Sequence, residues 1–220
     1  DSVKNFNSSV YWHKINDTTY TPKIEKYIVS SDTTAQLLVD QTTKISSTNA
    51  LNGNSNKNIV DFTLPIGTIS WSYYIGVGSE GKNEYEKSKN KALSTAFGFL
   101  SKMSGFGSLA SLAFNGISAF NKVQGIDNVK YWFIQDWNSV QYFQQDLTFY
   151  QYKQGNVVND ASQMKFPLNG KVYLGLLNDN IADPIDVIVK VSVIVVDTKW
   201  DTRNIQEMKI KLIEKPYLKN

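Results

Sequence analysis

The stretch IDVIVKVSVIV, residues Ile185–Val195, carries the clearest structural pattern in the chain. Isoleucine or valine occupies every odd position, whereas Asp186, Lys190 and Ser192 occupy even positions. Side chains alternate between the two faces of a β-strand, so this period of two predicts a strand with one buried face.

Other segments indicate that this strand belongs to a β-rich fold. Residues 46–58 are rich in Asn, Ser and Gly without periodicity, which predicts a long exposed loop. The tail 200–220 is charged and is compatible with a terminal strand or helix. Further strands are expected at 33–45, 59–64, 69–75, 131–134 and 172–177, and one long or two short strands from Val140 to Tyr152.

The spacing of apolar residues changes in the middle of the chain. Tyr85, Ala92, Ala96 and Leu100 follow a helical period, and a second helical stripe runs over 109–120 after the break at 104–107. We therefore expect a helical hairpin at about 79–121, inserted between strands. The predicted fold class is mainly β with inserted α: a single antiparallel β-sandwich domain over 1–220 that carries this hairpin, with ends at 1–20 and 200–220 that can be flexible.

The stretch GVGSEG, residues 76–81, matches the glycine fingerprint of dinucleotide-binding proteins letter for letter. That fingerprint also requires a parallel strand after the helix and an acidic residue about 20 positions further on, for the ribose. Residues 98–102 contain no carboxylate, and a second helical stripe follows instead of a strand. The pattern favours a structural role, in which Gly76 and Gly78 end a strand, Ser79 caps a helix and Glu80 complements its dipole.

Composition argues against several functional classes. The net charge is only +3 and Arg203 is the one arginine, which does not favour nucleic-acid binding. The chain has no Cys, and His13 is its single histidine, so thiolate chemistry and sites built from several histidines are excluded. Paired carboxylates are available, but their spacing selects no pair, and the nucleophile motif G-x-S-x-G is absent. We expect no enzyme, no cofactor and no metal.

The loop at 178–186 is the densest cluster of oxygen-bearing side chains. Its carboxylates and amides could bind calcium, although it lacks the EF-hand spacing. The same Asn, Asp and Pro residues are typical of a plain turn, which is the interpretation we favour.

Two features could carry function. The first is a set of aromatic residues which, together with strand-end loops, would contact a protein or a glycan: Trp132, Trp137, Tyr142, Tyr150, Tyr152, Asn178, Asp179, Asn180 and Asp183. The second is the Gly/Ala/Phe-rich hairpin 92–121, which could insert into a membrane as in pore-forming proteins, through Phe97, Phe99, Phe106, Phe114, Ile117 and Phe120.

The main hypothesis is a non-enzymatic binding or interaction module. Abundant Asn, Ser and Thr with few Arg, and a first residue other than Met, favour an exported protein that is secreted, periplasmic or at the cell surface. A membrane-active protein and a glycan-binding domain are the alternatives. A purely structural role also stays open for both features: the aromatic residues would form pairs in the core, and the small residues of the hairpin would allow close packing.

The C-terminal strands resemble a known pattern. Lys171–Asn180 followed by Ile185–Val195 looks like the closing hairpin of Golgi-dynamics (GOLD) type β-sandwich domains, in which an aliphatic-aromatic strand ends in an Asn-containing turn before a Val-rich strand. The resemblance covers residues 130–197, and the helices at 79–121 depart from it. It implies a non-catalytic sandwich for protein or ligand interaction and identifies no site residue.

Overall fold

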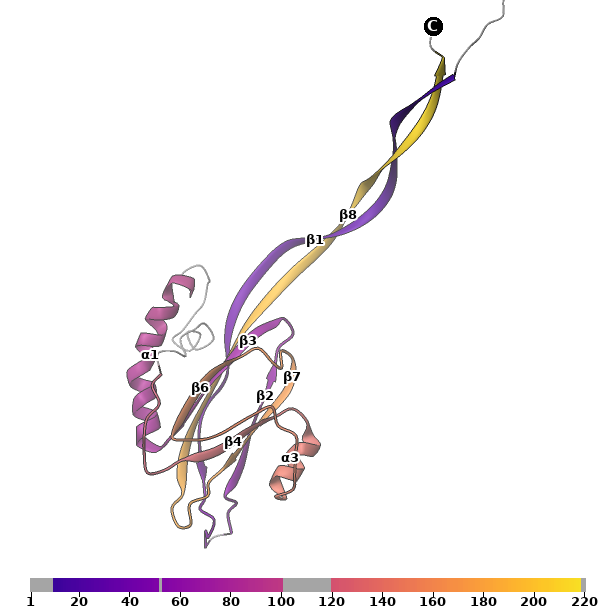
Figure 1. The fold of residues 1–220 in the computed structure, drawn as a ribbon. Helices are drawn as coiled ribbons and strands as arrows, with labels where there is room; N and C mark the ends of the chain where they lie inside the picture. Colours follow the sequence, from indigo (N-terminus) through magenta and orange to yellow (C-terminus); the bar gives the residue numbers. More distant parts are fainter. Residues whose placement is uncertain (1–9, 52, 101–119, 219–220) are drawn as a thin grey trace, which may run out of the picture. The chain divides into compact units, whose positions relative to one another are not determined.

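The chain is mainly β, with two four-stranded antiparallel sheets in a computed structural model that describes residues 10–51, 53–100 and 120–218 (Figure 1). The first sheet has the order β1 (Val10–Ile45), β8 (Ile185–Leu218), β3 (Thr68–Val77) and β6 (Asn159–Met164). The second has the order β2 (Lys57–Leu64), β7 (Gly170–Leu177), β4 (Val129–Ile134) and β5 (Lys153–Val157). The strands expected around 33–45, 59–64, 69–75, 131–134, 172–177 and 185–195 are confirmed.

The chain divides into two compact units, described separately below. The sheet unit comprises residues 31–197. The ribbon unit comprises residues 1–30 and 198–220, and its described part is the first half of β1 and the second half of β8. Residues 10–20 and 200–218, expected as ends that can be flexible, are β-strand.

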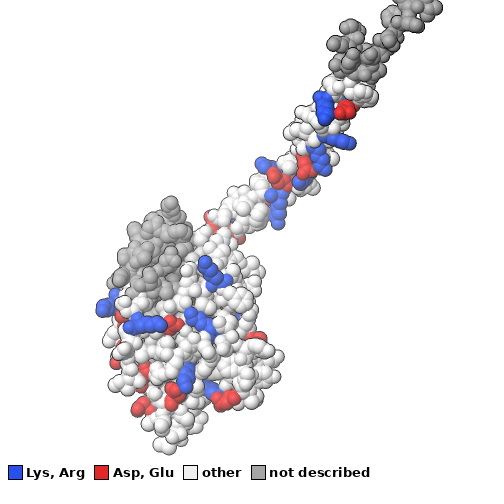
Figure 2. All heavy atoms as spheres, viewed as in Figure 1, with Lys and Arg blue, Asp and Glu red and all other residues white. Residues whose placement is uncertain are grey.

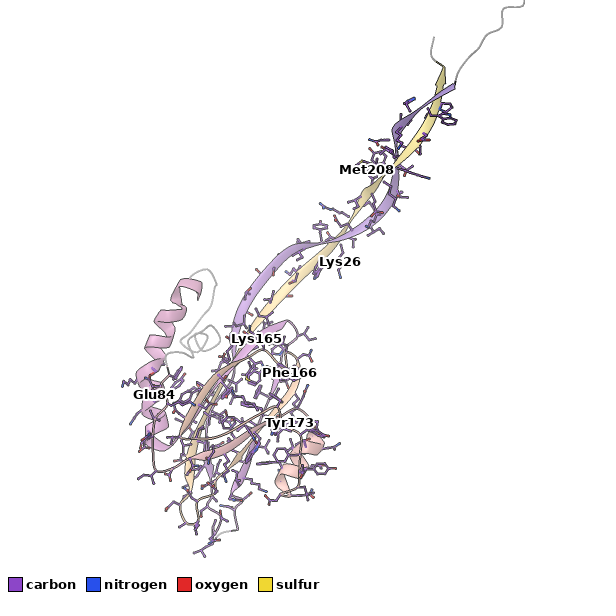
Figure 3. The ribbon with its side chains drawn as sticks, viewed as in Figure 1. Lys26, Glu84, Lys165, Phe166, Tyr173 and Met208 are labelled. Atoms are coloured by element: carbon purple, nitrogen blue, oxygen red, sulfur yellow. The ribbon has the colours of Figure 1, made fainter. Side chains whose placement is uncertain are left out.

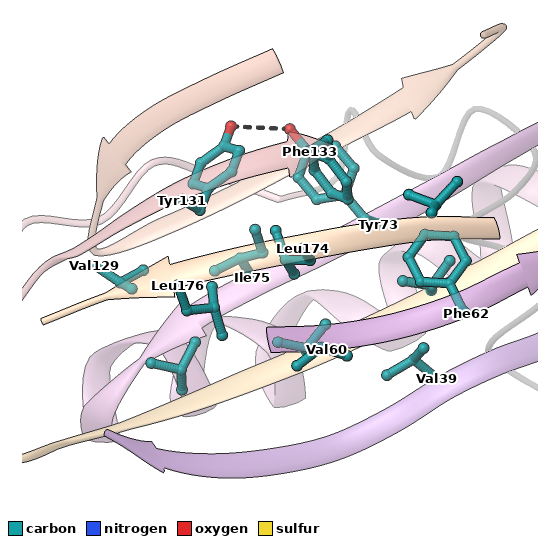
Figure 4. Close-up of a cluster of buried hydrophobic side chains, with 14 of the residues drawn as sticks. Val39, Val60, Phe62, Tyr73, Ile75, Val129, Tyr131, Phe133, Leu174 and Leu176 are labelled. Atoms are coloured by element: carbon teal, nitrogen blue, oxygen red, sulfur yellow. Dashed lines mark hydrogen bonds between the residues drawn. The ribbon is translucent and has the colours of Figure 1, made fainter. Parts of the chain in front are cut away.

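The core of the sheet unit lies between its two sheets, in a sandwich-like arrangement (Figure 4). Trp71 of β3 contacts Phe62 of β2 and Phe133 of β4, with ring centroids 5.5 and 5.3 Å apart. Val187, Val189, Val191 and Val193 are fully buried, as the period of two predicts. Ser192 and Ile194, on the opposite face, are buried as well, so this part of β8 is covered on more than the predicted face.

The segments that resemble a GOLD-type closing hairpin do not form a hairpin. β7 pairs with β2 and β4, whereas β8 pairs with β1 and β3, so the loop between β7 and β8 crosses from one sheet to the other. The buried Asn178 side chain holds this crossing. Its amide donates hydrogen bonds to the carbonyl oxygens of Ile45, Ser46 and Asp183, at 3.3, 3.1 and 2.9 Å.

The strand expected from Val140 to Tyr152 is wrong, because residues Trp137–Gln144 form the helix α3. Asp136 caps this helix by accepting a 2.8 Å hydrogen bond from the amide of Ser139. The same bond holds the pKa of the Asp136 carboxyl below its usual value. Val140 and Phe143, three positions apart on one face, are buried against the second sheet, and this packing outweighs their strand propensity.

Helix α1 (Gly78–Leu100) confirms the first arm of the expected helical hairpin, whereas the second arm falls within 101–119, outside the described residues. The glycine pattern before it has a packing role. A Cβ on Gly81 would lie 2.5 Å from the carbonyl carbon of Gly76, so the backbones touch where β3 turns into α1. Glu80 lies in the first turn as expected, and the helix begins at Gly78, one residue before the expected cap at Ser79.

A polar and aromatic anchor holds residues 120–121 at α1, beside Glu84, which is labelled in Figure 3. Glu84 accepts a 2.8 Å hydrogen bond from the amide of Asn121, and Phe120 packs on Tyr74 and Tyr85. Burial opposes ionisation of Glu84, but hydrogen bonds from Ser88 and Asn121 outweigh it and lower the pKa of this carboxyl. The chain therefore leaves α1 and is fixed back onto it at residue 121.

Candidate interaction site

In the ribbon unit, β1 and β8 run antiparallel, and their cross-strand contacts define the faces. Lys23 pairs with Glu207 at 2.8 Å, and Arg203 pairs with Glu25 at 2.6 Å, so residue numbers fall along β8 as they rise along β1. Both pairs join odd-numbered residues. Because side chains alternate along each strand, odd-numbered residues share one face of the ribbon and even-numbered residues share the other.

The even-numbered face carries most of the exposed large apolar side chains of the described ribbon unit. The ribbon unit has nine exposed large apolar side chains among its described residues, and eight of them have even numbers. Val29 is the exception. The eight, called the even face from here on, are Trp12, Tyr20, Ile24, Ile28, Trp200, Met208, Ile210 and Leu212, with exposed fractions from 52% to 71%.

The odd-numbered face carries most of the charge. From 198 to 212 the charged residues of β8 have odd numbers without exception: Lys199, Asp201, Arg203, Glu207, Lys209 and Lys211. Figure 2 shows these basic and acidic groups interleaved along the ribbon unit. The guanidinium of Arg203 also lies 5.3 Å from the ring centre of Tyr27, another odd-numbered residue. The exposed side chains of the ribbon are therefore mainly apolar on the even face and mainly charged on the odd face, where Ile15, Ile205 and Ile213 are half-buried. In this sense the ribbon is amphipathic.

The backbone of this ribbon has open edges. β3 pairs with β8 only from Val187 to Val195, and β1 pairs only with β8 among the described strands. Each strand of the ribbon unit thus presents one row of amide and carbonyl groups without a strand beside it. A two-stranded ribbon is marginally stable in water by itself, and an exposed apolar face with open edges is a surface suited to association.

The five aromatic residues predicted to bind a ligand fall into two groups. Trp137, Tyr142 and Tyr150 are exposed around α3, and Trp137 also contacts Tyr173 at 5.6 Å. Trp132 is half-buried, contacts Phe143 at 5.3 Å and donates a hydrogen bond to Gln154. Tyr152 is half-buried against the main core. The structure therefore brings three of the five to the surface near one helix.

The predicted loop residues form hydrogen bonds and an ion pair with other parts of the protein. Asn178 is fully buried, and its Oδ1 accepts a hydrogen bond from the amide of Asn180. Asp179 forms an ion pair with Lys130 at 2.9 Å. The side-chain amide of Asn180 donates a hydrogen bond to Asp127, and the backbone carbonyl of Asp183 accepts one from the Asn178 side chain. Among the described residues no group of three or more His, Cys, Asp or Glu could hold a metal ion.

A shallow cavity of about 790 Å³ lies beside this loop. Its lining comes from the end of β1, from the loop after β1 and from residues 181–184, and it includes Lys44, Asn49, Leu51 and Ile181. It lies beside the strand-end loops that were expected to contact a partner, and its walls mix polar and apolar groups.

Most of the residues proposed for membrane insertion cannot be placed. Phe106, Phe114 and Ile117 lie outside the described residues, and the side chains of Phe97 and Phe99 are not described either. Phe120 is half-buried in the cluster with Tyr74 and Tyr85. In the described part of the chain, no helix has the length and apolarity needed to cross a membrane.

One buried cluster combines titratable groups from three strands. The Tyr73 hydroxyl donates to Asp160 Oδ2 at 2.6 Å, Tyr131 donates to the same oxygen, and the two phenol oxygens lie 3.1 Å apart. Figure 4 marks the contact between the two phenols. Burial and then the bond to Asp160 raise the pKa of both tyrosines, so both stay neutral donors near neutral pH. The cluster ties β4 of one sheet to β3 and β6 of the other.

The fold and these surfaces define a mainly β protein with two antiparallel sheets and an amphipathic two-stranded ribbon. No protein-family model, no curated protein and no solved structure matches the chain. The GOLD-type resemblance of residues 130–197 therefore stays a prediction.

The even face was missed by the sequence-based predictions, although a pattern for it exists. Met208, Ile210 and Leu212 alternate with Lys209 and Lys211, which is a period of two. The rest of the ribbon dilutes this pattern with Thr, Asn and Gln. Only the pairing of β1 with β8 places Tyr20 and Ile24 on the same face as Met208.

Proposed function

We propose that this protein is a non-enzymatic interaction module that binds another protein chain through the even face of its ribbon unit. The observation that carries this proposal is the one-sided distribution of the exposed large apolar side chains, eight of nine on one face. Scattered exposed apolar residues are normal on any protein. A row of them on one face of a ribbon, with charge on the opposite face, is typical of a surface that becomes buried on binding.

The composition of the even face fits a protein–protein interface. It contains two Trp, one Tyr and one Met, residue types that are enriched at interfaces, among aliphatic side chains. Burial of this face would stabilise the complex by about 25 cal/mol for each Å² of apolar surface removed from water. The charged opposite face would remain in solvent and keep the bound form soluble.

Export to the cell surface, periplasm or medium forms part of this proposal, on the compositional grounds given above. A glycan partner is a second candidate, supported by the exposure of Trp137, Tyr142 and Tyr150 around α3. Carbohydrates bind on exposed aromatic rings, so Trp137→Ala should abolish retention on a glycan array if this candidate is correct. Retention unchanged by that substitution would remove α3 from consideration.

The main proposal is tested with a photo-crosslinking amino acid placed at two neighbouring positions. At Tyr20, on the even face, it should give a covalent protein adduct in the cells that make the protein. At Thr21, on the odd face, it should give none, and this position is the matched control. Equal adducts at both positions, or none at Tyr20, would overturn the proposal.

A further inference from the structure

We infer that the chain bound by the even face is a second copy of this protein, stacked ribbon on ribbon with both ribbons pointing the same way. This inference rests on the proposed function and names its partner. Two amphipathic ribbons that meet through their apolar faces make a two-layered, four-stranded assembly with charged outer faces. The same surface serves both copies, as a two-fold axis requires.

The dimensions of the ribbon suit such a dimer. Strands advance about 3.3 Å per residue and neighbouring strands lie about 4.8 Å apart, so the described ribbon, 10–30 with 198–218, is about 70 Å long and about 10 Å wide. One face therefore offers about 700 Å². A standard stable interface buries about 800 Å² on each partner, so the even face is large enough to be the main contact of a dimer.

The few charges on even-numbered positions are arranged to meet opposite or favourable groups. They are Lys14 and Lys26 on β1 and Glu214 on β8. The ion pairs Lys23–Glu207 and Glu25–Arg203 set a register that brings Lys14 opposite residues 214–216. The Lys26 Nζ lies 5.1 Å from the ring centre of Trp200. Lys26 and Met208, labelled in Figure 3, thus belong to one face.

A two-fold axis along the ribbon places β1 of one copy over β8 of the other. Lys14 then faces Glu214 of the second copy, and Lys26 faces its Trp200, so attractive pairs are formed at both ends. No like charges are opposed on this face. Between the two ends, the even-numbered positions from 16 to 24 and from 198 to 212 carry no charge. The centre of the face therefore consists of apolar and uncharged polar side chains.

The polar residues of the same face favour a protein over a lipid surface. Even-numbered positions include Asn16, Thr18, Thr202, Asn204 and Gln206. In an interface these side chains hydrogen-bond to the partner chain or to trapped water. In hydrocarbon they would lie unsatisfied, as would the open backbone edges of a single ribbon.

The first experiment uses the absence of native cysteine. Equal amounts of full-length Tyr20→Cys and Met208→Cys chains are mixed and oxidised, because the stacking places residue 20 of one copy over residue 208 of the other. We expect a covalent dimer of the two variants. The matched control mixes Thr21→Cys with Lys209→Cys, whose residues lie on the odd face, and should give at least about tenfold less product, a difference of about 1.4 kcal/mol in effective association.

The second experiment measures the mass of the full chain by sedimentation equilibrium over a wide concentration range. The wild type should be a dimer whose Kd rises at least about tenfold in Ile24→Asp. Val29→Asp is the control, because Val29 is exposed to 58% on the odd face and should leave the Kd unchanged. Circular dichroism of each variant checks that the sheet unit is folded.

Each outcome has a distinct meaning. A wild type that is monomeric at every concentration, or a Val29→Asp effect equal to that of Ile24→Asp, overturns the inference. If the monomeric chain still gives a Tyr20-specific adduct with a different protein in cells, the proposed function stands and only its partner changes. If the monomer instead floats with phosphatidylglycerol vesicles and gives no protein adduct, both the inference and the proposed function fail.

Discussion

The two halves of β8 both have apolar residues at alternate positions, but these residues are buried in the first half and exposed in the second half. From Ile185 to Val195 the apolar residues hold the odd positions and are buried in the core of the sheet unit. From Thr198 to Leu212 the exposed large apolar residues Trp200, Met208, Ile210 and Leu212 hold even positions, whereas Ile205 holds an odd position and is half-buried. The exposed apolar residues of the second half thus have the opposite parity to the core valines of the first half, within one strand.

β1 shows the same change. Val39 and Ile45 are odd-numbered and buried, whereas Trp12, Tyr20, Ile24 and Ile28 are even-numbered and exposed. Because the side-chain period of a strand is two, a change of parity moves the apolar set to the other face of the same strand. The exposed apolar set of the ribbon unit and the buried apolar set of the sheet unit can therefore be compared by substitutions in each unit.

The largest difference is expected from placing one charge in each half of β8. Val191→Asp puts an unpaired carboxylate into the core and should lower the free energy of unfolding by at least about 4 kcal/mol. Ile210→Asp, measured at a dilution where the chain is a single copy, should change it by no more than about 0.5 kcal/mol. Urea denaturation measures both. Similar losses in the two variants would show that the ribbon face is core.

The next largest effect is expected from alkaline pH, which should lower the stability of the sheet unit. Burial raises the pKa of Tyr73, Tyr74, Tyr85, Tyr131 and Tyr152, all in this unit. Their contribution to stability is fully present below the pKa of about 10 of an unfolded tyrosine. It is lost as pH rises above that value, by about 1.4 kcal/mol per pH unit for each phenol that ionises only on unfolding.

Unfolding in urea, followed by tyrosine absorbance at increasing pH, checks this expectation. Tyr152→Phe removes one raised phenol without opening the cluster around Asp160, and should make the decline shallower. A free energy of unfolding that does not change above pH 10 would contradict the assignment of these tyrosines to buried, neutral states.

The cluster that ties the two sheets should show an intermediate effect. Asp160→Ala removes the acceptor of two buried phenols and should lower the free energy of unfolding by about 2–3 kcal/mol. Asp160→Asn keeps one acceptor oxygen, and its cost should be about half as large. Thermal or urea denaturation distinguishes them, and equal losses in the two variants would show that the charge of the carboxylate, and not the number of acceptor oxygens, matters.

The smallest effect is expected from the charged face of the ribbon. Arg203→Ala removes a pair with Glu25 in which both side chains are about half exposed, and should change stability by no more than about 0.5 kcal/mol. High salt should abolish even this difference, since exposed pairs are screened. Dimer affinity should be unaffected, because Arg203 lies on the odd face.

The sequence-based predictions are most accurate for features that depend on residues close together in the chain. The period of two at Ile185–Val195 is a local pattern, and it correctly located β8. The helix α3 also has local evidence in the cap Asp136 and the spacing of Val140 and Phe143, but its aromatic residues favoured a strand. The aromatic residues of this segment are typical of a strand, but the cap at Asp136 and the burial of Val140 and Phe143 on one side give a helix.

The features that sequence alone did not reveal are non-local. Tyr73, Tyr131 and Asp160 come from three strands, and no spacing along the chain relates them. The even face requires the register of β1 on β8, two strands separated by most of the chain. Asn178 was predicted to contact a partner, but it is buried. Its side-chain amide holds the chain where it crosses from one sheet to the other.

The pairing of β1 with β8 also has a mechanical consequence. Val10 and Leu218 begin and end the described ribbon side by side, at the same end of two antiparallel strands (Figure 1). Tension applied to both ends at once would load the ribbon's hydrogen bonds one after another, as in a zipper, rather than together in shear. The ribbon should therefore open at low force, and a second copy stacked on it would act as a clasp whose release depends on concentration.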